Sequence, residues 1–325
     1  MIFSLAITGP TASGKTALSL ELAERLSGEI ISCDSMQIYK GMDIGTAKAT
    51  ADERARVPHH LIDFLDPRES YSVERYRDAA IASARDIVSR GRLPILVGGT
   101  GLYVSALTRT SAVVSPESDP EYRERILSSL KTEEDRDTLW QRLLSVDPES
   151  AEKIHKNNVK RVIRALEIYD KTGKPKSLLD RETQDGKSEI SVGMITVDFH
   201  DRELLYSRVD SRVDVMLREG LIEEVEGLYK NGLLLPDTTA AQAIGYKEIV
   251  GYLRGERTLD SAVEEIKLST RRYAKRQLTW FRHTEGAKVI YADREAGGLK
   301  SLSELTEEAI QISYVLIESD NKYIK

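Results

Sequence analysis

The chain has 325 residues, 40% of them hydrophobic and 31% charged, with a formal net charge of −6. These values are typical of an ordinary globular protein that is long enough for two domains, or for one domain with a large insertion. Cys33 is the only cysteine, which excludes a disulfide within the chain and indicates a reducing compartment.

The first predicted element is a strand over residues 2–7. Its apolar run is too short for a secretion signal, and no basic region precedes it. The chain contains no apolar stretch of membrane-spanning length. We therefore expect a cytoplasmic protein that does not enter a membrane.

The loop after this strand fits the spacing G-x-x-x-x-G-K-[ST] and opens a helical pattern. Its glycines let backbone N–H groups converge on phosphate oxygens at a helix N-terminus, where the helix dipole favours negative charge. Lys15 adds a positive charge, and Thr16 can offer a hydroxyl to Mg²⁺. The loop therefore predicts a site for a phosphate or diphosphate, with Mg²⁺ as the cofactor. Its residues are Gly9, Pro10, Thr11, Ala12, Ser13, Gly14, Lys15 and Thr16.

Strand and helix patterns alternate over the first hundred residues, which is typical of a parallel α/β sheet. One predicted strand, Glu29–Cys33, ends at Asp34, and another, Leu93–Val97, ends at the Gly98–Gly101 turn. A helix is predicted between them over residues 73–90. Because ligands of such sheets bind beyond the carboxyl ends of the strands, we expect the phosphate loop, Asp34 and this turn to share one site.

The pattern changes near Ser115, where strand signals end and helical segments begin. Thr132 and Asp135 form a predicted capping box, and Gly173 ends the last helical segment. We predict an all-helical insertion over residues 115–183, set into an α/β core of residues 1–114 and 184–325. The helices predicted in the insertion cover residues 121–130, 132–144, 148–155 and 159–171.

The core is predicted to resume with a strand over Ile190–Val197. Long helices are then predicted over residues 202–230, 240–253 and 259–283. The tail after Ala292 is predicted to form a surface helix with frayed ends and no chemistry.

Basic residues are clustered although the whole chain is acidic. Residues 271–283 contain five Lys or Arg and no acid, and a second cluster lies between Lys153 and Arg164. An acidic protein with two basic islands is expected to hold a polyanion at a defined place.

Seven blocks carry motifs over about 275 residues: 9–16 (GPTASGKT), 34–48 (DSMQIYKGMDIGTAK), 59–63 (HHLID), 98–103 (GGTGLY), 161–167 (RVIRALE), 243–248 (AIGYKE) and 275–282 (KRQLTWFR). Together they resemble the bacterial tRNA dimethylallyltransferases, the tRNA isopentenyltransferase family. The resemblance implies a P-loop NTPase-like sheet core. It also implies transfer of the dimethylallyl group of dimethylallyl diphosphate to N6 of adenosine 37 of tRNA, with release of diphosphate.

The resemblance implies that Asp34 is the general base, that Thr100 lines the reaction channel and that Arg212 clamps the diphosphate. An adenine N6 amine is a weak nucleophile, so a carboxylate that accepts its proton would assist it. Donors aimed at the departing diphosphate would stabilise its growing charge. Without the resemblance, Asp34 could be a helix cap or a Mg²⁺ ligand, Thr100 a solvated turn residue and Arg212 a surface arginine.

The resemblance also implies that the protein binds the anticodon stem-loop and extrudes the target base. Trp280 and Phe281, by contrast, are expected in the core. The predicted tRNA-binding residues are Asp34, Ser35, Met36, Gln37, Arg123, Lys160, Arg161, Val162, Ile163, Arg164, Gln242, Ala243, Ile244, Gly245, Tyr246, Lys247, Lys275, Arg276, Gln277 and Arg282.

Other functions stay open on the residues alone. The phosphate loop by itself would suit a small-molecule or nucleotide kinase, and the basic islands would suit a noncatalytic RNA-binding module. A prenyltransferase acting on free adenylates is a further alternative. His59 and His60 have no third ligand at a suitable spacing, so we expect no metal site there. We expect a monomer.

Overall fold

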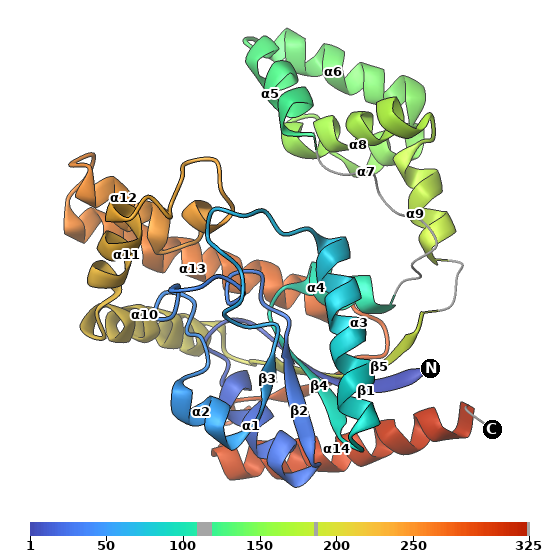
Figure 1. Ribbon diagram of the computed structural model, residues 1–325, viewed down its shortest axis with the longest axis vertical. Coiled ribbons are helices and arrows are strands. Elements are labelled where there is room, and N and C mark those ends of the chain that lie inside the picture. The colour runs from blue at the N-terminus through green and yellow to red at the C-terminus, as the bar shows by residue number, and fades with distance from the viewer. Residues whose placement is uncertain (109–118, 185–187, 324–325) are drawn as a thin grey trace. The chain divides into compact units, whose positions relative to one another are not determined.

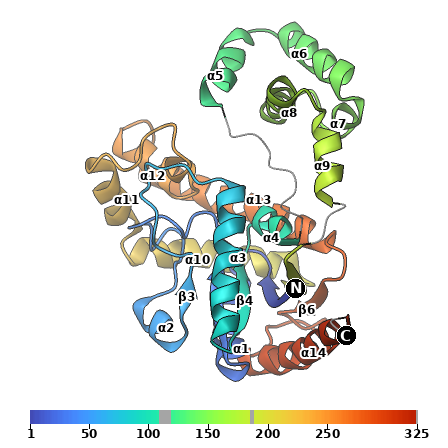
Figure 2. The ribbon, with the colours of Figure 1, turned by 45° about the vertical axis from the view of Figure 1, so that its right-hand side comes forward.

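The computed structural model describes residues 1–108, 119–184 and 188–323 (Figures 1 and 2). The chain divides into two compact units. The first joins Met1–Thr108 with Glu189–Lys325, and the second is Arg109–Ser188.

The first unit is built on a six-stranded sheet in which every neighbouring pair of strands is parallel. The strand order is β3-β2-β4-β1-β5-β6. This confirms the predicted α/β class with a P-loop NTPase-like parallel sheet. The strands are β1 (Ile2–Thr8), β2 (Gly28–Ser32), β3 (His59–His60), β4 (Leu93–Gly98), β5 (Ile190–Asp198) and β6 (Lys288–Tyr291).

Helices cover both faces of this sheet. Figures 1 and 2 show α3 lying along β4, whereas α14 lies beside α1. The helices of the first unit are α1 (Lys15–Arg25), α2 (Ala51–Arg56), α3 (Val73–Ser89), α4 (Gly101–Thr108), α10 (Arg202–Arg218), α11 (Leu221–Lys230), α12 (Tyr246–Leu253), α13 (Leu259–Arg282) and α14 (Leu302–Tyr323), with a 3₁₀ turn at Ala240–Gln242.

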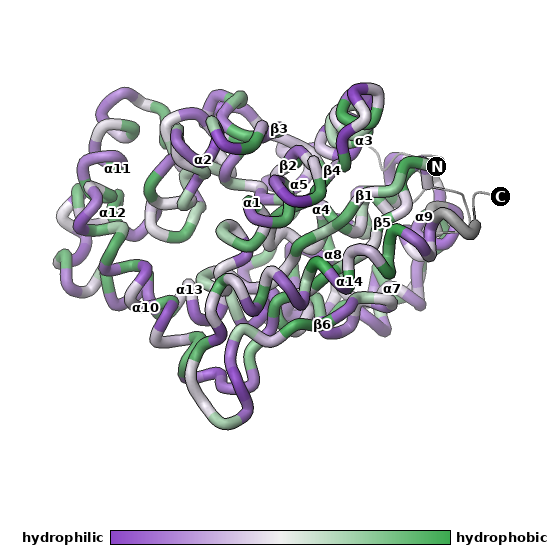
Figure 3. The backbone as a smooth tube through the Cα atoms, turned by 90° about the horizontal axis from the view of Figure 1, so that it is seen from below, coloured by the Kyte–Doolittle hydropathy of each residue, from purple (hydrophilic) through white to green (hydrophobic). Residues whose placement is uncertain are grey.

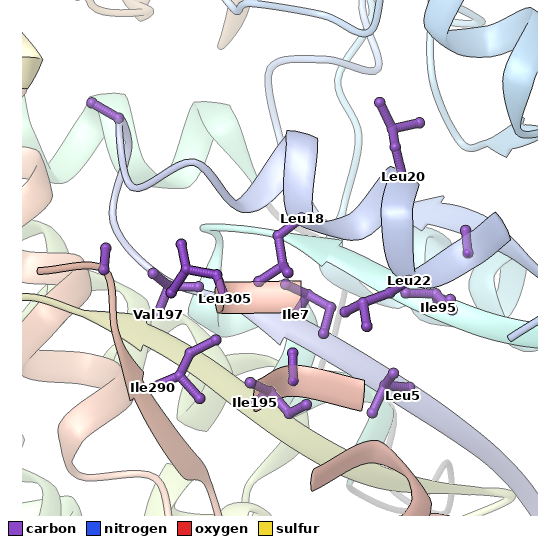
Figure 4. Packing of buried hydrophobic residues seen from close by; sticks show 14 of the residues in the cluster. Leu5, Ile7, Leu18, Leu20, Leu22, Ile95, Ile195, Val197, Ile290 and Leu305 are labelled. Atoms are coloured by element: carbon purple, nitrogen blue, oxygen red, sulfur yellow. The ribbon is translucent and has the colours of Figure 1, made fainter. Parts of the chain in front are cut away.

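The side chains of β1 contribute alternately to two separate cores, because successive side chains of a strand point to opposite faces of the sheet. Leu5 and Ile7 pack with α1, α13 and α14, where Leu305 is buried (Figure 4). Ala6 packs with α3 and α4 on the opposite face, around Tyr76. The apolar character of β1 is visible as a mostly green tube in Figure 3. Buried on both faces, the sheet holds its strand ends rigidly.

Two predicted helices are each broken by a glycine. Residues 202–230 form α10 and α11, separated at Gly220, whose φ is +101°. Residues 240–253 form the 3₁₀ turn and α12, separated at Gly245, whose φ is +97°. A positive φ interrupts helical hydrogen bonding and is easy for glycine, so the prediction of continuous helices was wrong at both places.

The predicted surface helix of the tail is α14, and it is more deeply packed than expected. Leu305, Ala309 and Ile310 are buried in the core shared with α1. Five short elements were not predicted from the sequence: α2, α4, β3, β6 and α9 (Lys176–Gln184).

A further core joins the segment after β2 to the helices α10–α12. Ile38, Tyr39 and Met42 pack there against residues such as Val213 and Tyr246. This packing joins parts of the chain that lie about two hundred residues apart in the sequence.

The second unit consists of helices over its described residues. Thr132 and Asp135 form the predicted capping box, Asp147 caps α7, and α8 ends at Gly173 in the left-handed region. Leu143 and Leu166 are fully buried in its own core. The predicted insertion, 115–183, falls within this unit, although its first residues lie outside those described. The helices are α5 (Pro120–Ser129), α6 (Glu133–Val146), α7 (Pro148–Lys153), α8 (Val159–Thr172) and α9.

Candidate active site

A cavity of about 620 Å³ lies in the first unit at the carboxyl ends of the central strands. The phosphate loop, the segment after β2 and the carboxyl end of β4 contribute to it, together with α10, α12 and α13. Thr100, which was expected to line the reaction channel, is not one of the described residues that line this cavity. Its lining includes Thr11, Lys15, Thr16, Asp34, Arg212 and Tyr273.

The phosphate loop has the backbone conformation that its glycines allow. Gly9 has a φ of +147°, and a Cβ there would lie 2.7 Å from the Val197 carbonyl oxygen. Gly14 has a φ of +89° immediately before α1. The Ser13 hydroxyl is buried and has no hydrogen-bond partner among the described residues. A buried polar atom without a partner is costly, so this loop is suited to a polar ligand.

Two cations border the cavity next to the loop. Lys15 Nζ donates a hydrogen bond to the Pro10 carbonyl at 3.2 Å. Burial, and then the neighbouring charge of Arg212, lower the pKa of Lys15 to about 8 against the opposing effect of Asp34. Burial likewise lowers the pKa of Arg212, with Asp34 again acting in the opposite direction. Cations crowded in this way favour an anionic ligand.

Asp34 lies two residues after the end of β2, and the residues on either side of it are bonded to the turn after β4. Its Oδ1 accepts the Met36 N–H at 2.9 Å. Thr100 Oγ1 accepts the Ser35 N–H at 3.2 Å, and the Thr100 N–H donates to the Cys33 carbonyl at 3.1 Å. A Cβ on Gly98 would lie 2.3 Å from that same carbonyl oxygen. The close approach of the two segments therefore requires glycine at this position.

Gln37 connects the segment after β2 with a loop that also lines the cavity. Its Oε1 accepts from the Ser32 hydroxyl at 3.0 Å, and its Nε2 donates to the carbonyls of Thr46 and Ala47. Residues 45–47 line the cavity beside it. The amide of Gln37 thus fixes one side of the pocket.

Glu224 of α11 holds the same loop from outside. Its carboxylate accepts the N–H groups of Asp43, Ile44 and Gly45 at 2.8, 2.7 and 3.1 Å. It also accepts the Tyr246 hydroxyl at 2.5 Å. Three successive backbone donors on one carboxylate order a loop that has no regular secondary structure. Glu224 was not predicted, because nothing in its helical surroundings distinguishes it from a surface glutamate.

The predicted tRNA-binding residues of the first unit fall into two groups. Most of them line the cavity: Ser35, Met36, Gln37, Gln242, Ala243, Ile244, Gly245, Tyr246, Lys247, Arg276 and Gln277. Arg282 instead pairs with the buried Asp198 through two contacts of 2.7 and 2.8 Å. Lys275 is exposed on α13.

The predicted residues of the second unit differ in exposure. Val162 and Ile163 are buried, whereas Lys160 and Arg161 are exposed. Two further basic residues share one buried carboxylate. Arg123 and Arg164 contact Glu167, which is fully buried, at 2.8 and 2.9 Å. Glu167 therefore ties α5 to α8 within this unit.

Arg208 and Tyr273 were not predicted, although both contact the site. Arg208 Nε donates to the Ala12 carbonyl in the phosphate loop at 2.9 Å. Tyr273 lines the cavity, and burial, followed by the charge of Asp34, raises its pKa to about 12. Trp280 is 43% exposed, so its expected place in the core was wrong, whereas Phe281 is buried as expected.

Within the described residues, no cluster of three or more His, Cys, Asp or Glu could hold a metal ion by itself. No described helix is both long enough and apolar enough to cross a membrane.

Comparisons with known proteins show the family of the chain. The sequence profile of the family described as IPP transferase matches residues 37–284, and that described as Isopentenyl transferase matches residues 3–63. A tRNA dimethylallyltransferase of Geobacillus thermodenitrificans is 52% identical over 278 residues, which are 85% of this chain and 86% of that protein.

Two solved structures are similar over almost the whole chain. The full-length tRNA isopentenylpyrophosphate transferase of Bacillus halodurans has a TM-score of 0.70 and 42% identity, and the match covers 99% of this chain and 100% of that one. A eukaryotic dimethylallyltransferase acting on tRNA has a TM-score of 0.80 and 32% identity, with coverage of 98% and 80%.

Proposed function

The chain belongs to the IPP transferase family, and on that premise we propose that it transfers the dimethylallyl group of dimethylallyl diphosphate to N6 of adenosine 37 of tRNA. The single observation that carries this proposal is the shared cavity: the phosphate loop and the Asp34 carboxylate both line it. A leaving-group site and a base on one cavity are what an allylic transfer requires.

The loop side of the cavity is suited to the departing diphosphate. When the C1–O bond of the donor breaks, its electron pair leaves on the diphosphate, whose negative charge grows. Lys15 and Arg212 are preorganised cations that line the cavity there, and the buried Ser13 hydroxyl of the same loop has no acceptor among the described residues of the protein. Fixed donors aimed at developing charge lower the barrier directly.

Asp34 is suited to activate the acceptor. The lone pair of the adenine N6 amine is delocalised into the ring, so the amine attacks weakly on its own. As the N6–C1 bond forms, Asp34 accepts the N6 proton, which leaves a neutral secondary amine. Thr100 and the Ser35 N–H hold the segment that carries Asp34, so the carboxylate has a defined position.

Mg²⁺ fits the residues present as a partner of the donor diphosphate. Mg²⁺ prefers oxygen ligands and in phosphate sites keeps several waters while it binds one or two protein groups. The Thr16 side chain, at the first turn of α1, and Asp34 both line the cavity and offer such oxygens. When bound, the ion would neutralise charge on the diphosphate.

The acceptor that we propose is the anticodon stem-loop of tRNA, with the target base extruded into the cavity. Its volume of about 620 Å³ supports binding of a base in addition to the prenyl donor. Exposed cations of both units, Arg276 and Lys275 on α13 and Lys160 and Arg161 on α8, are candidates for phosphate contacts. We propose that the protein acts as a monomer in the cytoplasm.

The test uses labelled dimethylallyl diphosphate with an anticodon stem-loop that carries adenosine at position 37, and the same RNA with guanosine there as the control. We expect N6-prenylated adenosine after digestion of the first RNA only. Parallel reactions offer AMP as acceptor, and labelled ATP in place of the prenyl donor. Preferred prenylation of AMP would indicate an adenylate prenyltransferase, and turnover of ATP with the prenyl donor ignored would indicate a kinase.

A further inference from the structure

Gln277 of α13 bridges two loops of the site from inside the protein. The residue is only 5% exposed. Its Oε1 accepts the Thr11 N–H of the phosphate loop at 2.9 Å, and its Nε2 donates to the Gly99 carbonyl at 3.0 Å. One amide thus connects the loop after β1 with the turn after β4.

The turn after β4 is shaped around α13. A Cβ on Gly99 would lie 2.0 Å from Gln277 Nε2, and a Cβ on Gly101 would lie 2.3 Å from the Trp280 ring. α13 itself is anchored by the buried Ala274 and Leu278. Both glycines therefore let a firmly packed helix approach the turn closely.

The connection continues from this turn to the carboxylate. Thr100, the residue after Gly99, accepts the Ser35 N–H and donates its own N–H to the Cys33 carbonyl. Tyr273, one turn before Gln277 on α13, lines the same cavity, and the neighbouring side chains of Thr100 and Gln277 act to lower the pKa of its hydroxyl against the larger effect of burial. The residues flanking Asp34 are therefore bonded to the same turn that Gln277 holds.

We propose that Gln277 is a positioning residue, which sets the phosphate loop and the Asp34 segment at a fixed separation. This role rests on the function proposed above: Gln277 keeps the leaving diphosphate aligned with the attacking amine. It departs from the predicted tRNA contact, because both ends of the amide are bonded to protein backbone. Glutamate would keep the acceptor for Thr11 and lose the donor for Gly99, and asparagine is one methylene too short.

The experiment compares Gln277→Met and Gln277→Glu with the wild-type protein. Gln277→Met keeps the volume and removes both hydrogen bonds, so we expect kcat to fall by about 10- to 100-fold, because small misplacements of reacting groups are costly. Affinity for the anticodon stem-loop should stay within about twofold, whereas the dissociation constant of inorganic diphosphate should rise. Gln277→Glu keeps the acceptor for the Thr11 N–H but places a carboxylate against the Gly99 carbonyl, so kcat should fall in this variant too, and wild-type kcat in either variant would overturn the proposal.

Gln311→Met on α14 is the matched control, since Gln311 is an exposed glutamine of a long helix outside the site. It should leave every one of these values unchanged. Loss of stem-loop affinity in Gln277→Met with unchanged kcat and diphosphate affinity would overturn the proposal and make Gln277 an RNA contact.

A measurement on the wild-type protein covers the case in which both variants fail to fold. The Thr11 amide hydrogen should exchange slowly in the ligand-free protein because Gln277 accepts it, and rapid exchange would overturn the proposal. Failure of the proposed function is distinguishable, because diphosphate affinity and hydrogen exchange need no prenyl transfer.

Discussion

At the scale of single residues, the cavity sets two cations and one carboxylate around the place where charge would develop. Lys15 and Arg212 each have a lowered pKa because burial disfavours their charged forms, and Asp34 partly offsets this effect in both. An anionic ligand would relieve the repulsion between the two cations. Their roles in the proposed reaction can be separated by substitution and by pH.

Replacing Asp34 by Asn should remove the base and keep the shape of the site. Because the amide still accepts the Met36 N–H but takes no proton, we expect kcat to fall by about 10²- to 10⁴-fold. Affinity for dimethylallyl diphosphate should change little. Single-turnover rates and equilibrium binding measure the two effects, and an unchanged rate would show that Asp34 is not the base.

The pKa of Lys15, about 8, predicts a pH dependence for donor binding. The ammonium is charged below this pKa and neutral above it, whereas dimethylallyl diphosphate stays fully ionised through this range. If only the charged form binds well, affinity should fall by about tenfold for each pH unit above 8. Lys15→Arg, which stays charged, should show no such fall whatever its absolute affinity. A flat titration of the wild-type protein between pH 7 and 9 would contradict this role.

At the scale of elements, loops with no regular structure form much of the cavity, and side chains from distant helices hold them. Lys48, which is buried, contacts Asp43 and Asp63 at 2.6 and 2.7 Å and also donates to the Tyr39 carbonyl. Together with Glu224, it closes the loop of residues 43–48 on itself and on α11. One wall of the pocket is therefore a loop that the polar contacts of Lys48 and Glu224 hold in place against the core of α10–α12.

Replacing Glu224 by Gln should loosen this loop. The amide presents its own N–H groups to a set of backbone donors, so we expect the free energy of unfolding to fall by about 1–3 kcal/mol. The Michaelis constant of the stem-loop acceptor should rise at the same time. Glu226→Gln is the control, because Glu226 pairs with Lys230 one turn along α11 and its side chain is 41% exposed. Urea denaturation and steady-state kinetics compare the two variants. Equal stability and equal kinetics of both would contradict the proposed role of Glu224 in ordering the loop.

Helix ends that depend on neighbouring residues were predicted better than those that depend on tertiary packing. The capping box at Thr132, the cap at Asp147 and the left-handed Gly173 depend on a few neighbouring residues, and these helix ends were predicted closely. The breaks at Gly220 and Gly245 were not. Isolated glycines are tolerated within helices, and only packing against the rest of the core decided that the chain turns there.

At the scale of the whole molecule, the net charge of −6 means that a polyanion must be held by local groups of basic residues. The basic residues of α13 differ in the protein groups that they contact. Arg282 is committed to the buried Asp198, whereas Arg276 is exposed on the same helix near the Tyr273 ring. The two arginines therefore make different predictions.

Arg276→Ala should weaken binding of the anticodon stem-loop and reduce the slope of log affinity against log salt by about one. Arg282→Ala should leave that slope unchanged and lower the free energy of unfolding by about 1–3 kcal/mol, because the buried Asp198 carboxylate loses its partner. Salt titrations and thermal unfolding separate the two effects. A reduced slope with unchanged stability in Arg282→Ala would return Arg282 to the RNA contacts.

The sequence alone determined the α/β class, the phosphate loop, the position of Asp34 at a strand end and most helices of the second unit. These features depend on strand and helix periods and on the spacing within single motifs, each of which involves residues close together in the sequence. The sequence did not determine which side chains hold the loops of the site in place.

Only the tertiary structure decided that Gln277 bonds to Thr11, 266 residues away, that Glu224 binds the loop at Ile44, 180 residues away, and that Arg282 pairs with Asp198. The physical reason is that a buried hydrogen bond or ion pair is set by the distance between packed elements, which no local pattern encodes. In the sequence, a glutamine, a glutamate or an arginine on an amphipathic helix cannot be distinguished from an ordinary surface residue until its partner is known.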